Sequence, residues 1–282
     1  MSEEAKPEID PRNLLNGLTA KEWLSESTSV WTQRGLGAGH KEAEIERLHP
    51  APFSYTDVGR IIRMFTKPGQ LVLDPFAGVG STLKAAALDG RRGVGFELYP
   101  SFAQLAELRL QTEVPSDLLD ANPQVVMRGD SRKLAARLDP ETVDLIVTSP
   151  PYWSILNKKS DHKQQQTREA HGLVTTYGDD ERDLGNIEDY DKFIEVLGDT
   201  LTASAAALKH KGYMVLIVGD FRHKSRYYMF HADIARELET RGLTLQAMNV
   251  LWQRHKRVFP YGYPFAYVPN VHHQNVIVMR KL

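Results

Sequence analysis

The chain contains no cysteine among its 282 residues. This absence excludes disulfide bonds, cysteine-ligated zinc, cysteine nucleophiles and the zinc-dependent base deaminases that use cysteine ligands. Net charge is almost absent too, because 35 lysines and arginines balance 36 aspartates and glutamates, so no overall field indicates a polyanionic partner. No apolar run approaches the length of a membrane span, and the acidic segment 1–10 is unlike a signal peptide. We therefore expect a soluble cytoplasmic protein without a membrane partner.

The stretch Thr148-Ser149-Pro150-Pro151-Tyr152-Trp153 follows an apolar run, 143–147, that the pattern predicts to be a buried strand. Two consecutive prolines must end the strand in a stiff, extended turn, and the carbonyls around them can point outward as free acceptors. Open α/β sheets bind ligands at the carboxyl ends of their strands. This rim of acceptors beside aromatic rings therefore suits a flat ring that bears an NH2 group. The alternative is a proline-stiffened loop over buried aromatic residues.

Strands and helices alternate through most of the chain. Apolar strands are predicted at 71–73, 93–96, 124–127 and 143–148, and helices at 81–88, 101–112 and 131–138. Further helices at 188–208 and 229–241 alternate with strands at 213–218, 243–253 and 275–280. This order predicts an α/β fold in which helices flank a parallel sheet.

Two segments depart from this alternation. Residues 1–48 read as an N-terminal extension, and about its first 17 residues are expected to be disordered. Capping-box patterns at Thr19–Glu22 and Ser54–Asp57 predict helix starts. The polar stretch 154–186 is long for a connection, and such loops are usually functional or disordered. We expect one domain at 49–282 with an insertion at 154–186.

A glycine-rich turn between the strand at 71–73 and the helix at 81–88 is typical of nucleotide-binding proteins, in which glycines let the backbone approach the ligand. Glu97 ends the next strand, where a carboxylate can bond both hydroxyls of a ribose. NAD, FAD and AdoMet proteins share this arrangement. AdoMet is favoured because Asp74 would repel a pyrophosphate but can hold an ammonium, and because Leu83 replaces the third dinucleotide glycine. The alternative is that Asp74 only caps the helix and Glu97 is a solvated strand end.

Together these motifs resemble the amino-group DNA methyltransferases, which make N4-methylcytosine or N6-methyladenine. His49-Pro50 with Phe53 is similar to their first AdoMet-contacting motif, and the segment 74–82 to their main AdoMet loop. Ser149-Pro150-Pro151-Tyr152 is similar to their catalytic signature. The resemblance implies a Rossmann-like, seven-stranded, mostly parallel sheet with helices on both faces, in which the last strand, 275–280, is antiparallel.

The resemblance also implies S-adenosyl-L-methionine (AdoMet) as the cofactor and double-stranded DNA as the partner. It assigns the following residues to the cofactor: His49, Pro50, Phe53, Asp74, Phe76, Gly78, Gly80, Ser81, Thr82, Glu97, Asp130 and Ser131. It assigns catalysis to Ser149, Pro150, Pro151 and Tyr152.

Methylation of an exocyclic amine requires its nitrogen lone pair to be freed from the ring and aimed at the methyl group. Hydrogen bonds from the NH2 group to Ser149 Oγ and the Pro150 carbonyl would favour this geometry, and Tyr152 with Trp153 would stack on a flipped base. Methylation at cytosine C5 needs a thiolate, which this chain lacks. Within the family, serine before Pro-Pro resembles cytosine-N4 enzymes, while adenine-N6 enzymes more often carry Asp or Asn. N4-cytosine is therefore the preferred target and N6-adenine the alternative.

Basic and aromatic residues in the second half of the chain could bind DNA, because cations meet phosphates and rings stack on bases. The candidates are Trp153, Lys158, Lys159, Arg222, Lys224, Arg254, Lys256 and Arg257, and the aromatic residues Trp252, Phe259, Tyr261, Tyr263, Phe265 and Tyr267. The alternative is that most of these aromatic residues are core or cover the cofactor pocket. No metal is expected, since His272-His273 has no acidic partner nearby.

One departure from the family concerns target recognition. The segments between the AdoMet loop and Ser149, and after the last strand, leave no room for a separate recognition domain. Recognition therefore falls to the insertion 154–186 and the C-terminal segment, or to a second subunit, which is either another copy of the chain or a separate protein. An RNA methyltransferase and a non-catalytic, nucleic-acid-binding subunit remain alternatives, although Asp74, Gly78, Ser149 and Tyr152 are all present.

Overall fold

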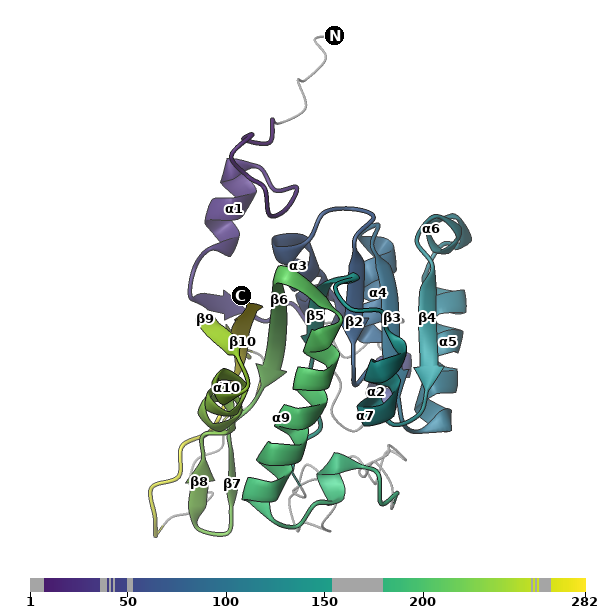
Figure 1. Cartoon of the computed structure of the whole chain (residues 1–282). Coiled ribbons are helices and arrows are strands. Elements are labelled where there is room, and N and C mark those ends of the chain that lie inside the picture. The colour runs from purple at the N-terminus through teal and green to yellow at the C-terminus, as the bar shows by residue number, and fades with distance from the viewer. Residues whose placement is uncertain are drawn as a thin grey trace.

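An eight-stranded mixed sheet forms the centre of the molecule in a computed structural model (Figure 1). The structure describes residues 8–35, 40, 42, 44–49, 53–153, 180–254, 256, 258 and 265–282. The strands of the sheet are β1 (Val30–Thr32), β2 (Leu71–Asp74), β3 (Arg92–Glu97), β4 (Gln124–Arg128), β5 (Val143–Thr148), β6 (Leu208–Val218), β9 (Leu243–Trp252) and β10 (His273–Lys281). Their spatial order is β1-β9-β10-β6-β5-β2-β3-β4. The short strands β7 (Phe221–His223) and β8 (Arg226–Tyr228) form a separate antiparallel hairpin.

Strand direction in the sheet follows the prediction. β4, β3, β2, β5 and β6 run parallel to one another, while β10 is antiparallel to both β6 and β9. The predicted Rossmann-like sheet with an antiparallel last strand is therefore confirmed. The predicted count of seven strands is wrong, because β1 adds an eighth strand parallel to β9, with Val30 opposite Val250. A strand of three residues is too short to carry an alternating pattern.

The helices match the predicted alternation and add two short elements that were not predicted, α2 and α6. The helices are α1 (Ala20–Glu26), α2 (Glu44–Leu48), α3 (Tyr55–Phe65), α4 (Ser81–Leu88), α5 (Pro100–Glu113), α6 (Ser116–Ala121), α7 (Ser131–Leu134), α9 (Tyr190–Ala206) and α10 (Phe230–Thr240). The 3-10 turns η2 (Ala135–Arg137) and η3 (Leu184–Asn186) follow α7 and precede α9. No helix among these described segments is both long and apolar enough for a membrane span.

The two predicted capping boxes have different outcomes. At α1, Thr19 and Glu22 exchange hydrogen bonds, from Glu22 N to Thr19 Oγ1 at 3.3 Å and from Thr19 N to Glu22 Oε2 at 2.8 Å, so this box is confirmed. At α3, the box is wrong because the Ser54 side chain does not cap the helix. Asp57 instead accepts a hydrogen bond from Arg34 N at 2.8 Å.

Helices cover both faces of the sheet (Figure 1). On one face, α9 and α10 bury Phe193, Leu197 and Phe230 against the strands. On the other face, α3 buries Ile61 and Ile62, and α4 and α5 continue the layer. The parallel strands all end at one edge of the sheet, so the loops that follow β2, β3, β4 and β5 meet there.

Candidate functional site

Asp74 links three segments at the carboxyl edge of the sheet. It ends β2 and is completely buried. Its Oδ1 accepts hydrogen bonds from Thr148 Oγ1 at 2.5 Å and from Phe76 N at 3.0 Å, and its Oδ2 accepts one from Thr82 Oγ1 at 2.5 Å. Burial raises the pKa of Asp74 to about 6. The carboxylate therefore joins the end of β2, the end of β5 and the first turn of α4.

The glycine-rich turn after β2 needs glycine at two positions. Gly78 and Gly80 have φ angles of +53° and +78°, which L-residues rarely adopt. A Cβ atom on Gly78 would lie 3.0 Å from His49 Nε2, and one on Gly80 would lie 2.9 Å from Ala106 Cβ. The turn thus packs between His49 on one side and α5 on the other, which leaves no space for a side chain.

Glu97 at the end of β3 holds this turn in place. Its Oε2 accepts a hydrogen bond from Gly78 N and its Oε1 accepts one from Tyr99 N, both at 2.8 Å. Burial, aided by the nearby carboxylates of Asp74 and Asp183, raises the pKa of Glu97 to about 7. Each carboxylate oxygen can accept a second hydrogen bond, and Glu97 lines a pocket.

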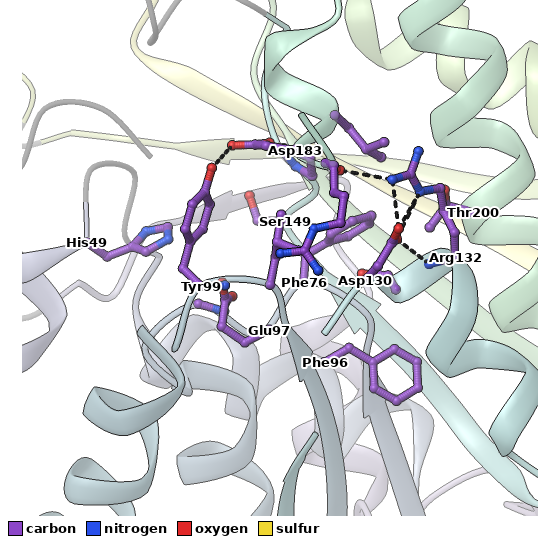
Figure 2. A pocket seen from close by; sticks show the side chains of 16 residues that line it. His49, Phe76, Phe96, Glu97, Tyr99, Asp130, Arg132, Ser149, Asp183 and Thr200 are labelled. Atoms are coloured by element: carbon purple, nitrogen blue, oxygen red, sulfur yellow. Dashed lines mark hydrogen bonds and ion pairs between the residues drawn. The ribbon is translucent and has the colours of Figure 1, made fainter. Parts of the chain in front are cut away.

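That pocket encloses about 600 Å³, including its open mouth (Figure 2). The predicted site residues that line it are His49, Phe76, Gly78, Glu97, Asp130, Ser131, Ser149 and Pro151. They come from separate stretches of the chain, so the fold brings the predicted cofactor residues together with the first part of the predicted catalytic signature.

The other predicted cofactor residues that the structure describes do not line the pocket. Gly80 shapes the turn, Thr82 bonds Asp74, and Ser81 Oγ accepts a hydrogen bond from Arg109 at 2.9 Å. Phe53 packs against the core under α3. Asp74 itself has no exposed surface and does not line the pocket. Pro50 lies outside the described residues. Cofactor contacts by these residues stay predictions.

At the end of the catalytic signature, Tyr152 is half-buried and Trp153 is buried. The backbone N–H of Gly219, just after β6, donates a hydrogen bond to the Tyr152 hydroxyl at 2.8 Å. The Tyr152 ring lies 5.9 Å from that of Phe230. Trp153 is only 6% exposed, and its Nε1 donates to the Glu188 carbonyl at 3.1 Å. Its ring contacts Tyr190, Phe221, His223 and Tyr228. These internal contacts explain the position of the Trp153 ring without a stacked DNA base. Ser149 and Pro151, by contrast, face the pocket.

The pocket residues that were not predicted include four polar ones: Tyr99, Arg132, Arg182 and Asp183. Arg132 forms a two-pronged ion pair with Asp130, at 2.9 Å from Nε to Oδ1 and 2.7 Å from Nη2 to Oδ2 (Figure 2). Arg182 pairs with Asp180 in the same way. The Tyr99 hydroxyl donates to Asp183 Oδ2 at 2.8 Å. Asp183 belongs to the predicted insertion, of which 154–179 lie outside the described residues. The sequence marks Asp183 only through the Asp-x-Gly spacing, which is typical of a local turn.

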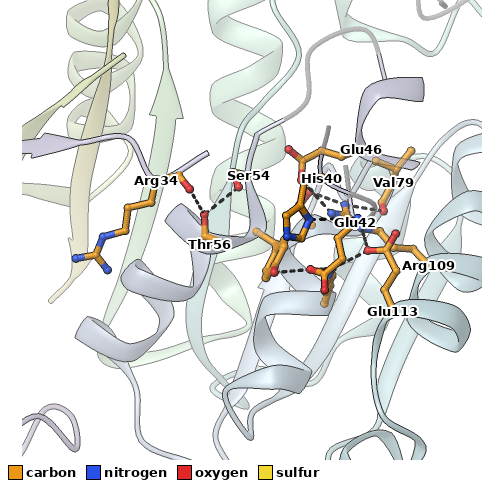
Figure 3. A network of polar contacts seen from close by, with 12 residues as sticks. Arg34, His40, Glu42, Glu46, Ser54, Thr56, Val79, Arg109 and Glu113 are labelled. Atoms are coloured by element: carbon orange, nitrogen blue, oxygen red, sulfur yellow. Dashed lines mark hydrogen bonds and ion pairs between the residues drawn. The ribbon is translucent and has the colours of Figure 1, made fainter. Parts of the chain in front are cut away.

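A buried ionic network fixes the segment that carries His49 (Figure 3). Arg109 of α5 is fully buried and donates to Glu46 Oε2 at 2.9 Å and to Glu113 Oε2 at 3.0 Å. It also donates to the Val79 carbonyl at 3.5 Å. Because Glu46 lies in α2, directly before His49, the network ties α2 to the glycine-rich turn.

The predicted DNA-binding residues that the structure describes lie on loops and on the hairpin. Lys224, at the turn of the β7–β8 hairpin, is exposed, as are Arg254 and Lys256, while Arg222 is half-buried. The tail aromatics Phe265 and Tyr267 are 86% and 91% exposed, so the core alternative does not hold for these two. Lys158, Lys159 and Arg257, with Phe259, Tyr261 and Tyr263, lie outside the described residues.

Comparisons with known proteins show which proteins the chain is similar to. Residues 1–108 match the N6/N4 methyltransferase family model, which is described as DNA methylase. The chain is 34% identical to type II methyltransferase M.ScaI of Streptomyces caespitosus over 90 residues, which are 32% of this chain and 30% of that protein. It is 33% identical to type II methyltransferase M.MjaI of Methanocaldococcus jannaschii over 123 residues, which are 43% of this chain and 39% of that protein. The predicted resemblance to the amino-group DNA methyltransferases is confirmed.

The likeness is partial in extent. The chain spans less than a third of the length of the first curated relatives it matches. Among solved structures, TTHA0409 of Thermus thermophilus, in complex with S-adenosyl-L-methionine, aligns with a TM-score of 0.38 and 24% identity. That alignment covers 54% of this chain and 53% of TTHA0409.

The raised pKa of Glu97 predicts a pH-dependent stability. In the unfolded chain, the pKa of the Glu97 carboxyl lies near its ordinary value of 4.5. In the folded protein, the carboxyl keeps its proton up to about pH 7. The folded state therefore binds more protons between these values, and stability should fall as the pH rises through this window. In Glu97→Gln, the decrease in the free energy of unfolding across this pH window should be smaller by on the order of 1–3 kcal/mol.

Urea denaturation at pH 5 and at pH 8 measures the effect on the free energy of unfolding. Glu239→Gln, at an exposed position of α10, is the matched control and should leave the difference between the two pH values unchanged. An unaltered difference in Glu97→Gln would contradict the assigned environment of Glu97.

Proposed function

We propose that this protein transfers a methyl group from S-adenosyl-L-methionine to the exocyclic amino group of a DNA base. One observation carries the proposal: Ser149 and Pro151 of the Ser-Pro-Pro-Tyr motif share a pocket with Glu97 and Asp130. The residues proposed to bind the nucleotide and those proposed to accept the amine face one space, as methyl transfer between two bound molecules requires.

The residues of the pocket fit the cofactor. Glu97 offers carboxylate lone pairs for the ribose hydroxyls, and Asp130 and Ser131 lie at the end of the neighbouring strand, where the adenine would be bound. Glycine at position 78 keeps the adjoining wall free of a side chain. When bound, AdoMet supplies an electrophilic methyl group on its sulfonium. The protein contributes position and hydrogen bonds.

The motif supplies the acceptors for the amine. The Ser149 hydroxyl and the Pro150 carbonyl would each accept a hydrogen bond from the NH2 group, which makes its nitrogen more tetrahedral and directs its lone pair. The Asp74–Thr148 hydrogen bond fixes the strand end directly before Ser149. An amine in a duplex cannot reach such a pocket, so the base must leave the stack. Tyr152 is the proposed stacking surface.

Cytosine N4 is the proposed target, with adenine N6 as the alternative. The preference rests on the serine that precedes Pro150, which resembles the cytosine-N4 members of the family. A serine hydroxyl and a proline carbonyl suit either amine, because both bases carry NH2 next to a ring nitrogen. Direct identification of the modified base therefore decides the target.

The β7–β8 hairpin is the proposed contact with duplex DNA. Residues 221–228 contain Arg222, Lys224 and Arg226 and no acidic residue. The hairpin lies at the same edge of the sheet as the carboxyl ends of the strands (Figure 1). Trp153, next to the catalytic motif, packs against Phe221 and Tyr228, so the hairpin is attached to the site. Arg254 and Lys256 would extend the basic surface.

The chemistry is tested in genomic DNA from a methylation-free host that expresses the chain. Digestion to nucleosides and mass spectrometry should find N4-methylcytosine with the wild type and none with Ser149→Ala. In vitro, Ser149→Ala should lower turnover at least ~100-fold and change AdoMet affinity less than ~3-fold, since the hydroxyl acts on the amine.

Ser116→Ala, at an exposed position of α6, is the control and should retain full methylation. N6-methyladenine would select the adenine alternative. Modified RNA with unmodified DNA would select an RNA methyltransferase, and AdoMet binding without any methylation would select a non-catalytic subunit. Full activity in Ser149→Ala would contradict the proposed role of the serine.

The hairpin contact is tested by salt-dependent binding to duplex DNA. Lys224→Ala with Arg226→Ala should weaken binding and reduce the slope of log K against log salt by about 1 for each phosphate that the variant no longer neutralises. The control is Arg92→Ala, which removes an exposed arginine at the start of β3, on the opposite edge of the sheet. Equal weakening in both variants, or none in either, would exclude the hairpin as the DNA-binding element.

A further inference from the structure

The cofactor proposed above carries an ammonium group, and the structure narrows which carboxylate can receive it. Asp74 was expected in this role. Its side chain has no exposed surface, and its two oxygens accept three hydrogen bonds from Thr148, Thr82 and Phe76. The Asp74 carboxylate is therefore taken up by hydrogen bonds within the protein, and the ammonium of the cofactor needs another partner.

Among the described residues, three carboxylates line the pocket: Glu97, Asp130 and Asp183. Asp130 is neutralised by its two-pronged pair with Arg132. Glu97 accepts two backbone N–H groups, and it ends the strand where the ribose is expected. Asp183 remains as the carboxylate with neither a cationic partner nor an assigned role.

The surroundings of Asp183 suit a ligand cation. Asp183 is 6% exposed and accepts hydrogen bonds from two neutral donors, the Tyr99 hydroxyl and Gly185 N, both at 2.8 Å. In the part of the chain that the structure describes, no lysine or arginine pairs with it, since neighbouring Arg182 pairs with Asp180. Two further lone pairs of the carboxylate are available. A nearly buried carboxylate of this kind is stabilised when a cation binds beside it.

We propose that Asp183 binds the ammonium at the amino-acid end of the cofactor. The inference rests on the proposed AdoMet site. It gives the segment 180–186 a defined function, because cofactor binding then holds this end of the predicted insertion against the pocket. Tyr99 acts as a positioning residue that orients the carboxylate through its hydroxyl (Figure 2).

Calorimetric affinities of the full chain for three adenosine ligands test the assignment. The ligands are S-adenosylhomocysteine, its des-amino analogue that lacks only the ammonium, and 5′-methylthioadenosine, which lacks the whole amino-acid end. Asp183→Asn keeps the shape and the acceptor for Gly185 N but removes the charge. It should weaken S-adenosylhomocysteine at least ~10-fold, as expected when a charge-assisted hydrogen bond is removed, and leave the other two ligands within ~2-fold.

Tyr99→Phe separates the positioning hydrogen bond from the charge, because it removes the hydrogen bond to Asp183 and keeps the carboxylate. It should weaken S-adenosylhomocysteine less than ~3-fold. Equal weakening of all three ligands by Asp183→Asn, or no weakening of any, would overturn the assignment. So would equal effects of Asp183→Asn and Tyr99→Phe.

The wild-type protein provides a second test that does not depend on the folding of a variant. It should bind the des-amino analogue at least ~10-fold more weakly than S-adenosylhomocysteine. Equal binding of these two ligands would refute the role of Asp183 and leave the proposed function intact. Failure of the wild type to bind any adenosine ligand would instead refute the proposed function itself.

Discussion

The buried carboxylate of Asp74 is the constraint on which the rest of the site depends. A charge without solvent is costly unless it is hydrogen-bonded, and here two hydroxyls and one backbone N–H satisfy it. Those donors come from β5, α4 and the turn after β2, so satisfying one carboxylate fixes three segments relative to one another. Ser149 follows Thr148 directly and is therefore held next to the glycine-rich turn.

Charges are distributed unevenly around this junction. Behind the glycine-rich turn, the fully buried cations Arg109 and Lys84 are paired with Glu46, Glu113 and Glu42. On the pocket side, the donors to Glu97 and Asp183 within the described residues are neutral. The internal network therefore rigidifies the turn, while Glu97 and Asp183 on the pocket side can still accept hydrogen bonds from a ligand. A sulfonium cofactor with an ammonium group complements such a pocket.

The sequence predicts the features that have strong local patterns. The strand, glycine turn and helix at 71–88 and the proline turn at Ser149 have distinctive residues, and the structure brings them together in one pocket. Features that depend on tertiary contacts could not be predicted. The three residues of β1 become a strand only by pairing with β9. Arg109 is a residue type that usually lies on the solvated face of a helix. Asp183 is one acidic residue within a long polar stretch. Trp153 was expected to stack on a flipped base, and its partners Tyr190, Phe221 and Tyr228 lie far from it in the sequence.

Titration of the purified chain with AdoMet, in the wild type and in Gly78→Val, tests the central claim most directly. A side chain at position 78 would press on His49 and demand an unfavourable backbone angle, so the turn would close on the pocket. We predict one AdoMet site per wild-type chain and at least ~10-fold weaker binding in a folded Gly78→Val variant. Absence of binding in the wild type, or undiminished binding in the variant, would contradict the account.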